Sequence, residues 1–208
     1  MVANPVVHIV DDDEAVRRSL AFMLGSAGLA VRVYESAGAF LDGLDDVHCG
    51  CLITDVRMPE ISGIELLYRL KERAPCFPAI VITGHGDVKL AVEAMKAGAI
   101  DFIEKPFDEE AILAAVKAAL EQGGDETDGD LAAVTSRIAS LSERERQVLE
   151  GLIAGQANKV MANALGISPR TVEVYRANLM AKMQARSLSE LIRMAILAHV
   201  PAPGRTPR

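Results

Sequence analysis

The sequence predicts an α/β domain followed by a smaller all-α domain, and three observations support this prediction. Across residues 6–120, five short apolar runs alternate with five amphipathic stretches, as in an open parallel sheet with helices on both faces. From residue 141 onward only helical patterns occur. Between these regions, the segment 122–136 is rich in Gly and Asp, and Gly123-Gly124 is the sharpest break in the chain. We therefore assign residues 1–122 to a first domain and residues 123–140 to a partly helical linker. Residues 141–200 form a second domain, and residues 201–208 a disordered tail.

The strands and helices of the first domain follow from its apolar pattern. Strands are expected at the apolar runs Val6–Val10, Ala30–Tyr34, Cys51–Thr54, Ala79–Thr83 and Asp101–Glu104. Helices are expected near residues 14–27, 36–44, 63–73, 87–97 and 108–120, and three of them begin at the plausible N-caps Ser36, Asp87 and Asp108. In a doubly wound sheet, ligands bind beyond the carboxyl ends of the strands, where the strand order reverses.

Four helices are expected in the second domain. The first opens at a capping box of Ser142 with Glu145 and should end at Gly155. The second runs from about Asn158 to Leu165 and stops at Gly166. The third opens at Ser168-Pro169, with Ser as the cap and Pro at the first helical position, and the fourth starts near Ser187.

Composition excludes several protein classes. Half of the 208 residues are hydrophobic and a quarter are charged, which is ordinary for a globular protein. No apolar run approaches the ~20 residues that span a bilayer, and the N-terminus lacks the basic stretch and apolar segment of a signal peptide. We therefore expect a cytoplasmic protein. Its three cysteines, Cys49, Cys51 and Cys76, are expected to be reduced, because no further Cys or His pair completes a zinc pattern.

The formal charge is distributed unevenly. Residues 1–121 carry −9, whereas residues 141–208 carry +5. An acidic first half and a basic second half suggest two tasks, the second involving nucleic acid. Uneven surface charge without a functional role is the alternative.

Polar side chains follow four of the five predicted strands. They are Asp11, Asp12 and Asp13 after the first strand, Asp55 after the third, Thr83 at the end of the fourth and Lys105 after the fifth. Because the carboxyl ends of parallel strands share one edge of a sheet, we expect these side chains to gather there. Crowded carboxylates repel one another unless a cation intervenes, and Mg²⁺ takes oxygen ligands of this kind.

This set of residues indicates phosphoryl-transfer chemistry. A carboxylate beside a divalent ion can attack phosphorus to give an aspartyl phosphate. Lys105 and the metal would stabilise charge on the transferring oxygens, and the Thr83 hydroxyl would bond them. Each residue alone has a plainer interpretation: Asp13 as a helix cap, Thr83 as a strand end, and Lys105-Pro106 as a turn.

The first domain resembles the receiver domains of bacterial response regulators, which have a flavodoxin-like (βα)₅ fold. The resemblance covers about residues 5–121 and is carried by the segments IVDDD, ITDVRMPEISGIELL and IVITGHGDVKLAVEAMKAGAIDFIEKPF. It implies that Asp55 is the phosphoacceptor and that Thr83 and Lys105 contact the phosphoryl group. It also implies Mg²⁺ ligation by Asp12, Asp55 and the main-chain carbonyl of Arg57, with Asp11 binding through water. It further implies a cis Lys105-Pro106 bond and a rotating aromatic residue, Phe102, that turns inward as Thr83 moves.

Residues 158–183 have the pattern of a DNA-binding helix-turn-helix: helix, short Gly-containing turn, helix. On the second of these helices, Val172, Leu179 and Met183 form one stripe, which should face the core. A second stripe could lie in the major groove, and other side chains could contact phosphates. The groove stripe is Arg170, Glu173, Val174 and Ala177, and the phosphate contacts are Lys159, Thr171, Tyr175, Arg176 and Lys182. A helical dimerisation module with solvated charges is the alternative.

The second domain resembles the LuxR/NarL-type output domain, through LSERERQVLEGLIAGQANKVMANALGISPRTVEVYRANLMAKMQARSLSELIRMA. Both halves together resemble the two-component response regulators of the LuxR/NarL–FixJ family, which includes regulators of nitrogen-fixation genes. Tyr175 stands where His is common in that family, and Met161 stands where Ile is common. The resemblance implies a phosphorylation-dependent, DNA-binding transcription regulator rather than an enzyme, usually an activator. Its expected partners are a cognate sensor histidine kinase, promoter DNA, RNA polymerase and a second copy of the chain, but not a membrane.

In relatives, the active dimer forms through the fourth helix and fifth strand, which carry Val92, Lys96 and Asp101 here. Lys96 could instead be merely solvated. Two other functions remain open: a metal-dependent phosphatase with an aspartyl-phosphate intermediate, although no cap insertion is evident, and a protein-interaction switch whose helical half binds protein.

Overall fold

The computed structural model describes residues 5–44, 50–74, 77–84, 88–121 and 128–200. Their contacts divide the chain into two units. One comprises residues 1–86 and 97–125, and the other comprises residues 87–96 and 126–208. The predicted cap Asp87, the start of the predicted linker and the predicted disordered tail lie outside the described residues.

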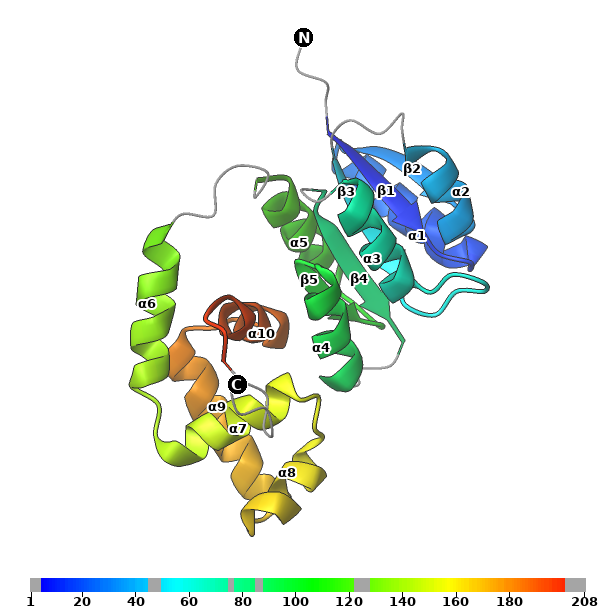
Figure 1. The fold of residues 1–208 in the computed structure, drawn as a ribbon. Helices are drawn as coiled ribbons and strands as arrows, with labels where there is room; N and C mark the ends of the chain where they lie inside the picture. Colours follow the sequence, from blue (N-terminus) through cyan, green and yellow to red (C-terminus); the bar gives the residue numbers. More distant parts are fainter. Residues whose placement is uncertain (1–4, 45–49, 75–76, 85–87, 122–127, 201–208) are drawn as a thin grey trace. The chain divides into compact units, whose positions relative to one another are not determined.

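The first unit is built on a five-stranded sheet in the order β2-β1-β3-β4-β5, with every neighbouring pair parallel (Figure 1). The strands are β1 Val6–Val10, β2 Ala30–Tyr34, β3 Gly50–Asp55, β4 Ala79–Thr83 and β5 Asp101–Glu104. The predicted doubly wound α/β fold is confirmed. The order reverses between β1 and β3, so the polar residues after these strands lie at the expected switch point.

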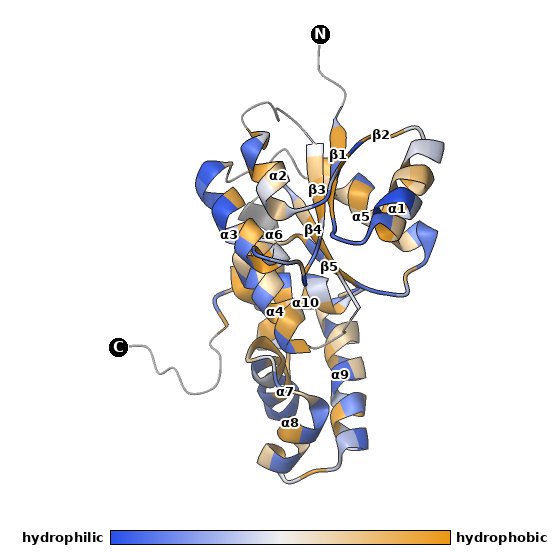
Figure 2. Ribbon diagram, turned by 90° about the vertical axis from the view of Figure 1, so that its right-hand side faces the viewer, coloured by the Kyte–Doolittle hydropathy of each residue, from blue (hydrophilic) through white to orange (hydrophobic). Residues whose placement is uncertain are grey.

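Helices cover both faces of the sheet because its central strands are apolar on both sides. The helices of this unit are α1 Glu14–Ser26, α2 Ala37–Asp42, α3 Gly63–Arg73 and α5 Glu109–Glu121; α4, Val88–Ala97, is grouped with the second unit. One core cluster joins β1, β3 and β4 to α1 and α5, and Ile9, Leu20, Ile53 and Ile112 are almost fully buried in it. The central strands β1, β3 and β4 are correspondingly mostly apolar in Figure 2.

Local signals in the sequence explain where these helices begin. The Asp13 carboxylate accepts bonds from the main-chain N–H groups of Ala15 and Val16 and so caps α1. Ser36 caps α2 as predicted, and Ser62 caps α3. The Asp13 cap lies in the loop after β1 that also carries Asp11 and Asp12.

Two further sequence predictions hold in this unit. The Lys105-Pro106 peptide bond is cis. Cys51 is a buried free thiol, and burial raises its pKa to about 12, so it stays protonated. Cys49 and Cys76 lie outside the described residues.

The second unit is helical, as predicted. Its remaining helices are α6 Asp128–Ala139, α7 Glu143–Ile153, α8 Asn158–Leu165, α9 Pro169–Met183 and α10 Leu188–Leu197. The capping box of Ser142 with Glu145 is present at the start of α7, and Gly166 ends α8 in the left-handed conformation. The core of the unit joins α6, α7, α8, α9 and α10. No helix among the described residues is long and apolar enough to cross a membrane.

Candidate functional site

Asp11, Asp55 and Lys105 meet at the carboxyl edge of the sheet. The Lys105 Nζ lies 3.0 Å from Asp11 Oδ2 and 2.8 Å from Asp55 Oδ1. Strand register produces this meeting, because Val10 pairs with Thr54 and the residues that follow each of them reach the same edge. Lys105 directly follows β5, and its ammonium forms an ion pair with each of the two carboxylates.

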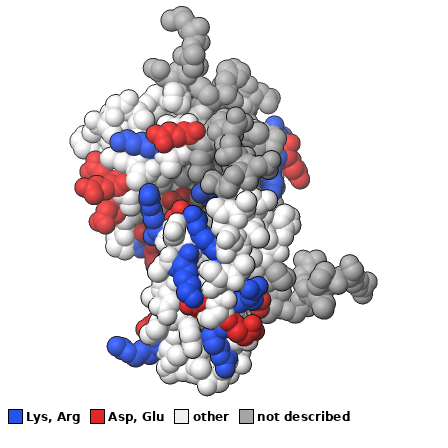
Figure 3. All heavy atoms as spheres, turned by 90° about the vertical axis from the view of Figure 1, so that its left-hand side faces the viewer, with Lys and Arg blue, Asp and Glu red and all other residues white. Residues whose placement is uncertain are grey.

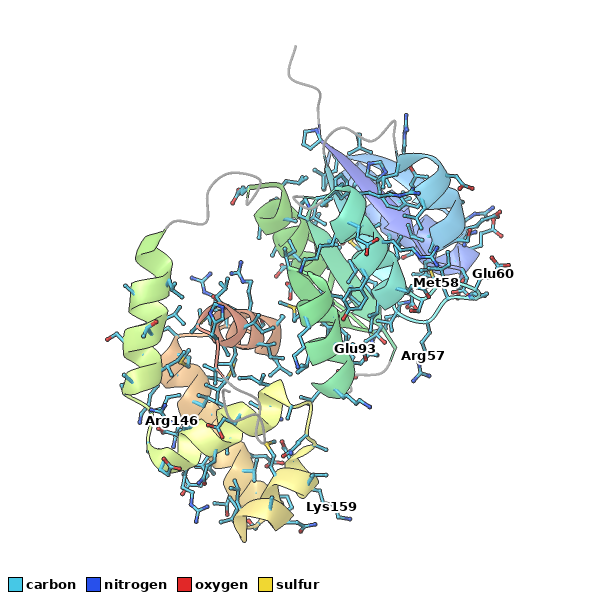
Figure 4. All side chains as sticks on the ribbon, viewed as in Figure 1. Arg57, Met58, Glu60, Glu93, Arg146 and Lys159 are labelled. Atoms are coloured by element: carbon cyan, nitrogen blue, oxygen red, sulfur yellow. The ribbon has the colours of Figure 1, made fainter. Side chains whose placement is uncertain are left out.

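Main-chain and side-chain bonds fix both carboxylates. Asp11 Oδ1 accepts a bond from the main-chain N–H of Asp13 at 2.9 Å, and Asp55 Oδ2 accepts one from that of Arg57 at 2.6 Å. The Arg17 guanidinium on α1 donates to the main-chain oxygen of Asp11 at 2.6 Å. The Arg57 side chain itself is exposed and points away from the sheet (Figure 4). The main chain that follows β1 and β3 therefore positions the carboxylates of Asp11 and Asp55.

The charges of this cluster depend on one another. Burial raises the pKa of Asp11, although the bond and charge of Lys105 oppose the shift. Burial alone would lower the pKa of Lys105, but its bonds to Asp55 and Asp11 and their charges outweigh burial and raise it. The ammonium is therefore held in its charged form between two buried carboxylates.

The other predicted residues of this edge lie at different depths. Thr83 is buried at the end of β4, and its main-chain oxygen accepts a 2.7 Å bond from the Lys105 N–H. Phe102 is half-buried on β5. Asp12 is exposed, and the Asp13 carboxylate is engaged in capping α1, which favours the cap interpretation of Asp13.

The donor set at this edge suits a hard cation. Among the described residues no group of three or more His, Cys, Asp or Glu side chains is arranged to hold a metal ion. The available donors are nonetheless all oxygens: two buried carboxylates, the exposed Asp12 next to Asp11, and the main chain at Arg57. This chemistry fits Mg²⁺, which keeps several waters and needs few protein ligands.

Two residues that sequence reasoning missed support this site. A Cβ added at Gly63 would lie 2.0 Å from the main-chain oxygen of Asp55, so only glycine allows α3 to start this close to β3. Arg17, described above, fixes the Asp11 main chain. Ser62 before Gly63 was an available signal for the helix start, but nothing in the sequence indicated the close approach or the contact of Arg17.

In the second unit, α9 carries the two stripes that were predicted. Val172, Leu179 and Met183 are fully buried in the helical core. The residues of the proposed groove stripe, Arg170, Glu173, Val174 and Ala177, are all exposed. Several Lys and Arg side chains lie on the helical part of the chain, in the lower half of Figure 3.

The predicted phosphate contacts of this unit differ in their surroundings. Lys159 is exposed and extends outward from α8 (Figure 4). The Thr171 main-chain N–H and hydroxyl both bond the Ser168 hydroxyl, at 3.0 and 2.8 Å, within the start of α9. Tyr175 is half-buried and packs against the helical core.

Arg176 and Lys182 each bond a side chain of another segment. Arg176 Nη1 donates to Asn158 Oδ1 at 2.9 Å. Lys182 Nζ lies 2.7 Å from Glu145 Oε2 in an ion pair. The Glu145 carboxylate is buried, and its bond to Lys182, followed by that from the Ser142 main chain, lowers its pKa to about 2. Glu145 is therefore ionised and neutralises Lys182 at neutral pH.

The residues of the predicted dimer face differ in their exposure to solvent. Val92 is buried and Lys96 is exposed. The Asp101 carboxylate is half-buried and accepts a 2.8 Å bond from the main-chain N–H of Phe102.

Comparison with protein families finds two matches. Residues 7–117 match the response regulator receiver domain, and residues 139–195 match the bacterial regulatory proteins of the luxR family.

Similar proteins match almost the whole chain. The transcriptional regulatory protein FixJ of Azorhizobium caulinodans is 61% identical over 206 residues, covering 97% of each chain. FixJ of Rhizobium meliloti is 56% identical over 192 residues, covering 91% of this chain and 94% of that protein. Among solved structures, full-length FixJ from B. japonicum has a TM-score of 0.57 and 51% identity, covering 95% of this chain and 98% of that one.

Proposed function

The chain belongs to the two-component response regulators that join a receiver domain to a luxR-family DNA-binding domain, and we propose that a phosphoryl group on Asp55 switches its DNA binding. We assign the receiver to residues 1–122, the linker to 123–140 and the DNA-binding domain to 141–200. The observation that carries the proposal is the meeting of Asp11, Asp55 and Lys105 at the switch point of the sheet. As a DNA-binding regulator, the protein would act in the cytoplasm.

Asp55 is the proposed nucleophile. Its Oδ2 is held by the Arg57 N–H, and its Oδ1 faces Lys105. In phosphotransfer from the cognate kinase, a carboxylate oxygen of Asp55 forms the new P–O bond as the P–N bond of a phosphohistidine breaks. The leaving imidazole takes up a proton. Among the described acidic residues, Asp11 is the other one that is buried and bonded to Lys105. Its Oδ1 already accepts a bond from the Asp13 N–H.

Lys105 supplies the fixed positive charge of this step. Its ammonium already bonds an Asp55 oxygen, so it can pair with the phosphoryl oxygens once they arrive. When Mg²⁺ is bound, it neutralises charge on the transferring oxygens. Asp11, Asp12, Asp55 and the Arg57 carbonyl are the groups that would hold it.

The phosphoryl group then acts as a switch. It adds negative charge and strong acceptors beside the end of β4, and the Thr83 hydroxyl would move to bond it, with Phe102 filling the space behind. We propose that this shifts the population of arrangements at α4 and β5, so that Val92, Lys96 and Asp101 form a two-fold interface.

A dimer would place two copies of α9 on successive half-sites about one DNA turn apart. Arg170, Glu173, Val174 and Ala177 would face base edges in the major groove. Lys159, Thr171, Tyr175, Arg176 and Lys182 would lie toward phosphates. Recruitment of RNA polymerase at such sites would make the protein an activator.

Uptake of phosphoryl groups from acetyl phosphate with Mg²⁺ tests the proposal, with intact mass as the readout. Wild type should gain one phosphoryl group and become dimeric in size-exclusion chromatography with light scattering. Asp55→Asn should do neither. Asp42→Asn, which changes an exposed aspartate at the end of α2, is the matched control and should behave as wild type. Phosphorylation of the Asp55→Asn variant would place the acceptor elsewhere.

A further inference from the structure

We propose that Asn158 is a positioning residue that holds the Arg176 guanidinium ready for a DNA phosphate. The Asn158 carboxamide oxygen, at the start of α8, accepts a 2.9 Å bond from Arg176 Nη1 on α9. The two residues are 18 positions apart and join the two helices of the helix-turn-helix. This role rests on the proposed DNA binding, and in it Asn158 acts on DNA only through Arg176.

The place of Asn158 argues against its usual role at a helix start. Asparagine is a favoured N-cap because its side chain accepts bonds from the first free N–H groups of a helix. Here the N-cap of α8 is Ala157, which makes no side-chain bond, and Asn158 is already inside the helix. Its carboxamide oxygen is directed to Arg176 instead.

The chemistry of the partner distinguishes Arg176 from Lys182. Lys182 is paired with the Glu145 carboxylate at 2.7 Å, so its charge is largely neutralised inside the unit. Asn158 is neutral, so Arg176 keeps its full positive charge. A guanidinium has five N–H donors, and one bond to Asn158 leaves the others for phosphate oxygens.

The bond also lowers the entropic cost of binding. A free arginine side chain must give up its rotamer freedom when it contacts DNA. A side chain already restrained by a half-buried bond has less to lose. Removing the Asn158 side chain should therefore weaken DNA binding by about two- to tenfold, the range expected when one rotamer-rich side chain must be ordered on binding.

The test is a double-mutant cycle in the full-length chain. The probe is a duplex selected from a random library by the wild-type chain in the presence of acetyl phosphate and Mg²⁺. Affinity is measured at several salt concentrations for wild type, Asn158→Ala, Arg176→Ala and the double variant. The matched control is Asn163→Ala, which changes an exposed asparagine near the other end of α8. The thermal unfolding of every variant is measured in parallel.

We expect Arg176→Ala to make the plot of log binding constant against log salt concentration less steep by about 0.9, which is the loss of one phosphate contact. Asn158→Ala should keep the wild-type slope, lose affinity, and have no effect in the Arg176→Ala background, whereas Asn163→Ala should bind as wild type. Equal losses from Asn158→Ala in both backgrounds, with a matching loss of thermal stability, would overturn the inference and make Asn158 a structural residue only. If the wild-type chain selects no duplex, the proposed DNA binding itself fails.

Discussion

Replacing Lys105 by Met should destabilise the sheet unit strongly at neutral pH. The change removes the ammonium that bonds Asp11 at 3.0 Å and Asp55 at 2.8 Å, and the two side chains keep only 4% and 10% of their surface exposed. Two buried carboxylates are then left facing each other without a cation.

The bonds in the structure set the size of this effect. A hydrogen bond to a charged group contributes about 1.5–3 kcal/mol, and two are lost. The Lys105 side chain is 25% exposed, so solvent screens part of the interaction, and the expected loss is about 2–4 kcal/mol.

The loss should depend on pH. Burial already raises the pKa of Asp11, and without the ammonium this pKa rises further. A carboxyl group whose pKa is higher in the folded state destabilises the fold as pH rises through that value, and the penalty disappears on acidification. The deficit of Lys105→Met relative to wild type should therefore be largest near pH ~7 and narrow toward pH ~5.

Urea unfolding followed by hydrogen exchange in peptides from β1 and β3 measures the sheet unit separately from the helical unit. Lys117→Met removes an exposed lysine of α5 and should change stability by less than about 0.5 kcal/mol. A Lys105→Met variant as stable as wild type at neutral pH, or with a deficit that does not shrink on acidification, would refute the interdependence of the three charges.

Three further outcomes are expected. Gly63→Ala should destabilise the sheet unit by about 3 kcal/mol in urea unfolding and reduce phosphoryl uptake, because the new Cβ would lie 2.0 Å from the Asp55 main-chain oxygen; unchanged uptake would contradict this close contact. Glu145→Gln should lower the stability of the helical unit by about 1–2 kcal/mol at neutral pH, since it removes the charge that pairs with Lys182. Because the pKa of Glu145 is lowered to about 2, its contribution is complete above the unfolded value and is lost as pH falls through the range from about 4.5 to 2, so thermal unfolding of wild type and variant should converge there. Gln184→Gly should raise the free energy of unfolding of this unit by about 0.5–1 kcal/mol, seen as a higher melting temperature. The reason is that Gln184 ends α9 at φ 57°, a conformation that glycine adopts without strain.

The sequence was sufficient for the fold because its strands are buried on both faces. β3 and β4 are apolar along almost their whole length, so they read as continuous runs, and Asp55 and Thr83 interrupt these runs where the strands end. Parallel register then brings the strand ends together, which explains why the sequence alone predicts the grouping of Asp11, Asp55 and Lys105.

The contacts that the sequence did not predict depend on how helices pack. Arg176 meets Asn158, and Lys182 meets Glu145, across 18 and 37 positions of the chain. Neither separation has the spacing of three or four residues at which side chains of one helix pair. The exposed positions of α9 follow from helical periodicity, whereas the choice of bonding partner follows from the angle between helices, which the periodicity does not contain.

DNA binding with and without phosphodonor tests the central claim most directly. Wild type and Asp55→Ala are titrated onto a duplex selected from a random library, in Mg²⁺ with or without acetyl phosphate, and the complexes are resolved by gel shift. The account predicts that acetyl phosphate tightens binding and yields a dimer-sized complex with wild type alone. Equal binding in all four samples would contradict it, because the phosphoryl group on Asp55 would then not control the DNA-binding domain.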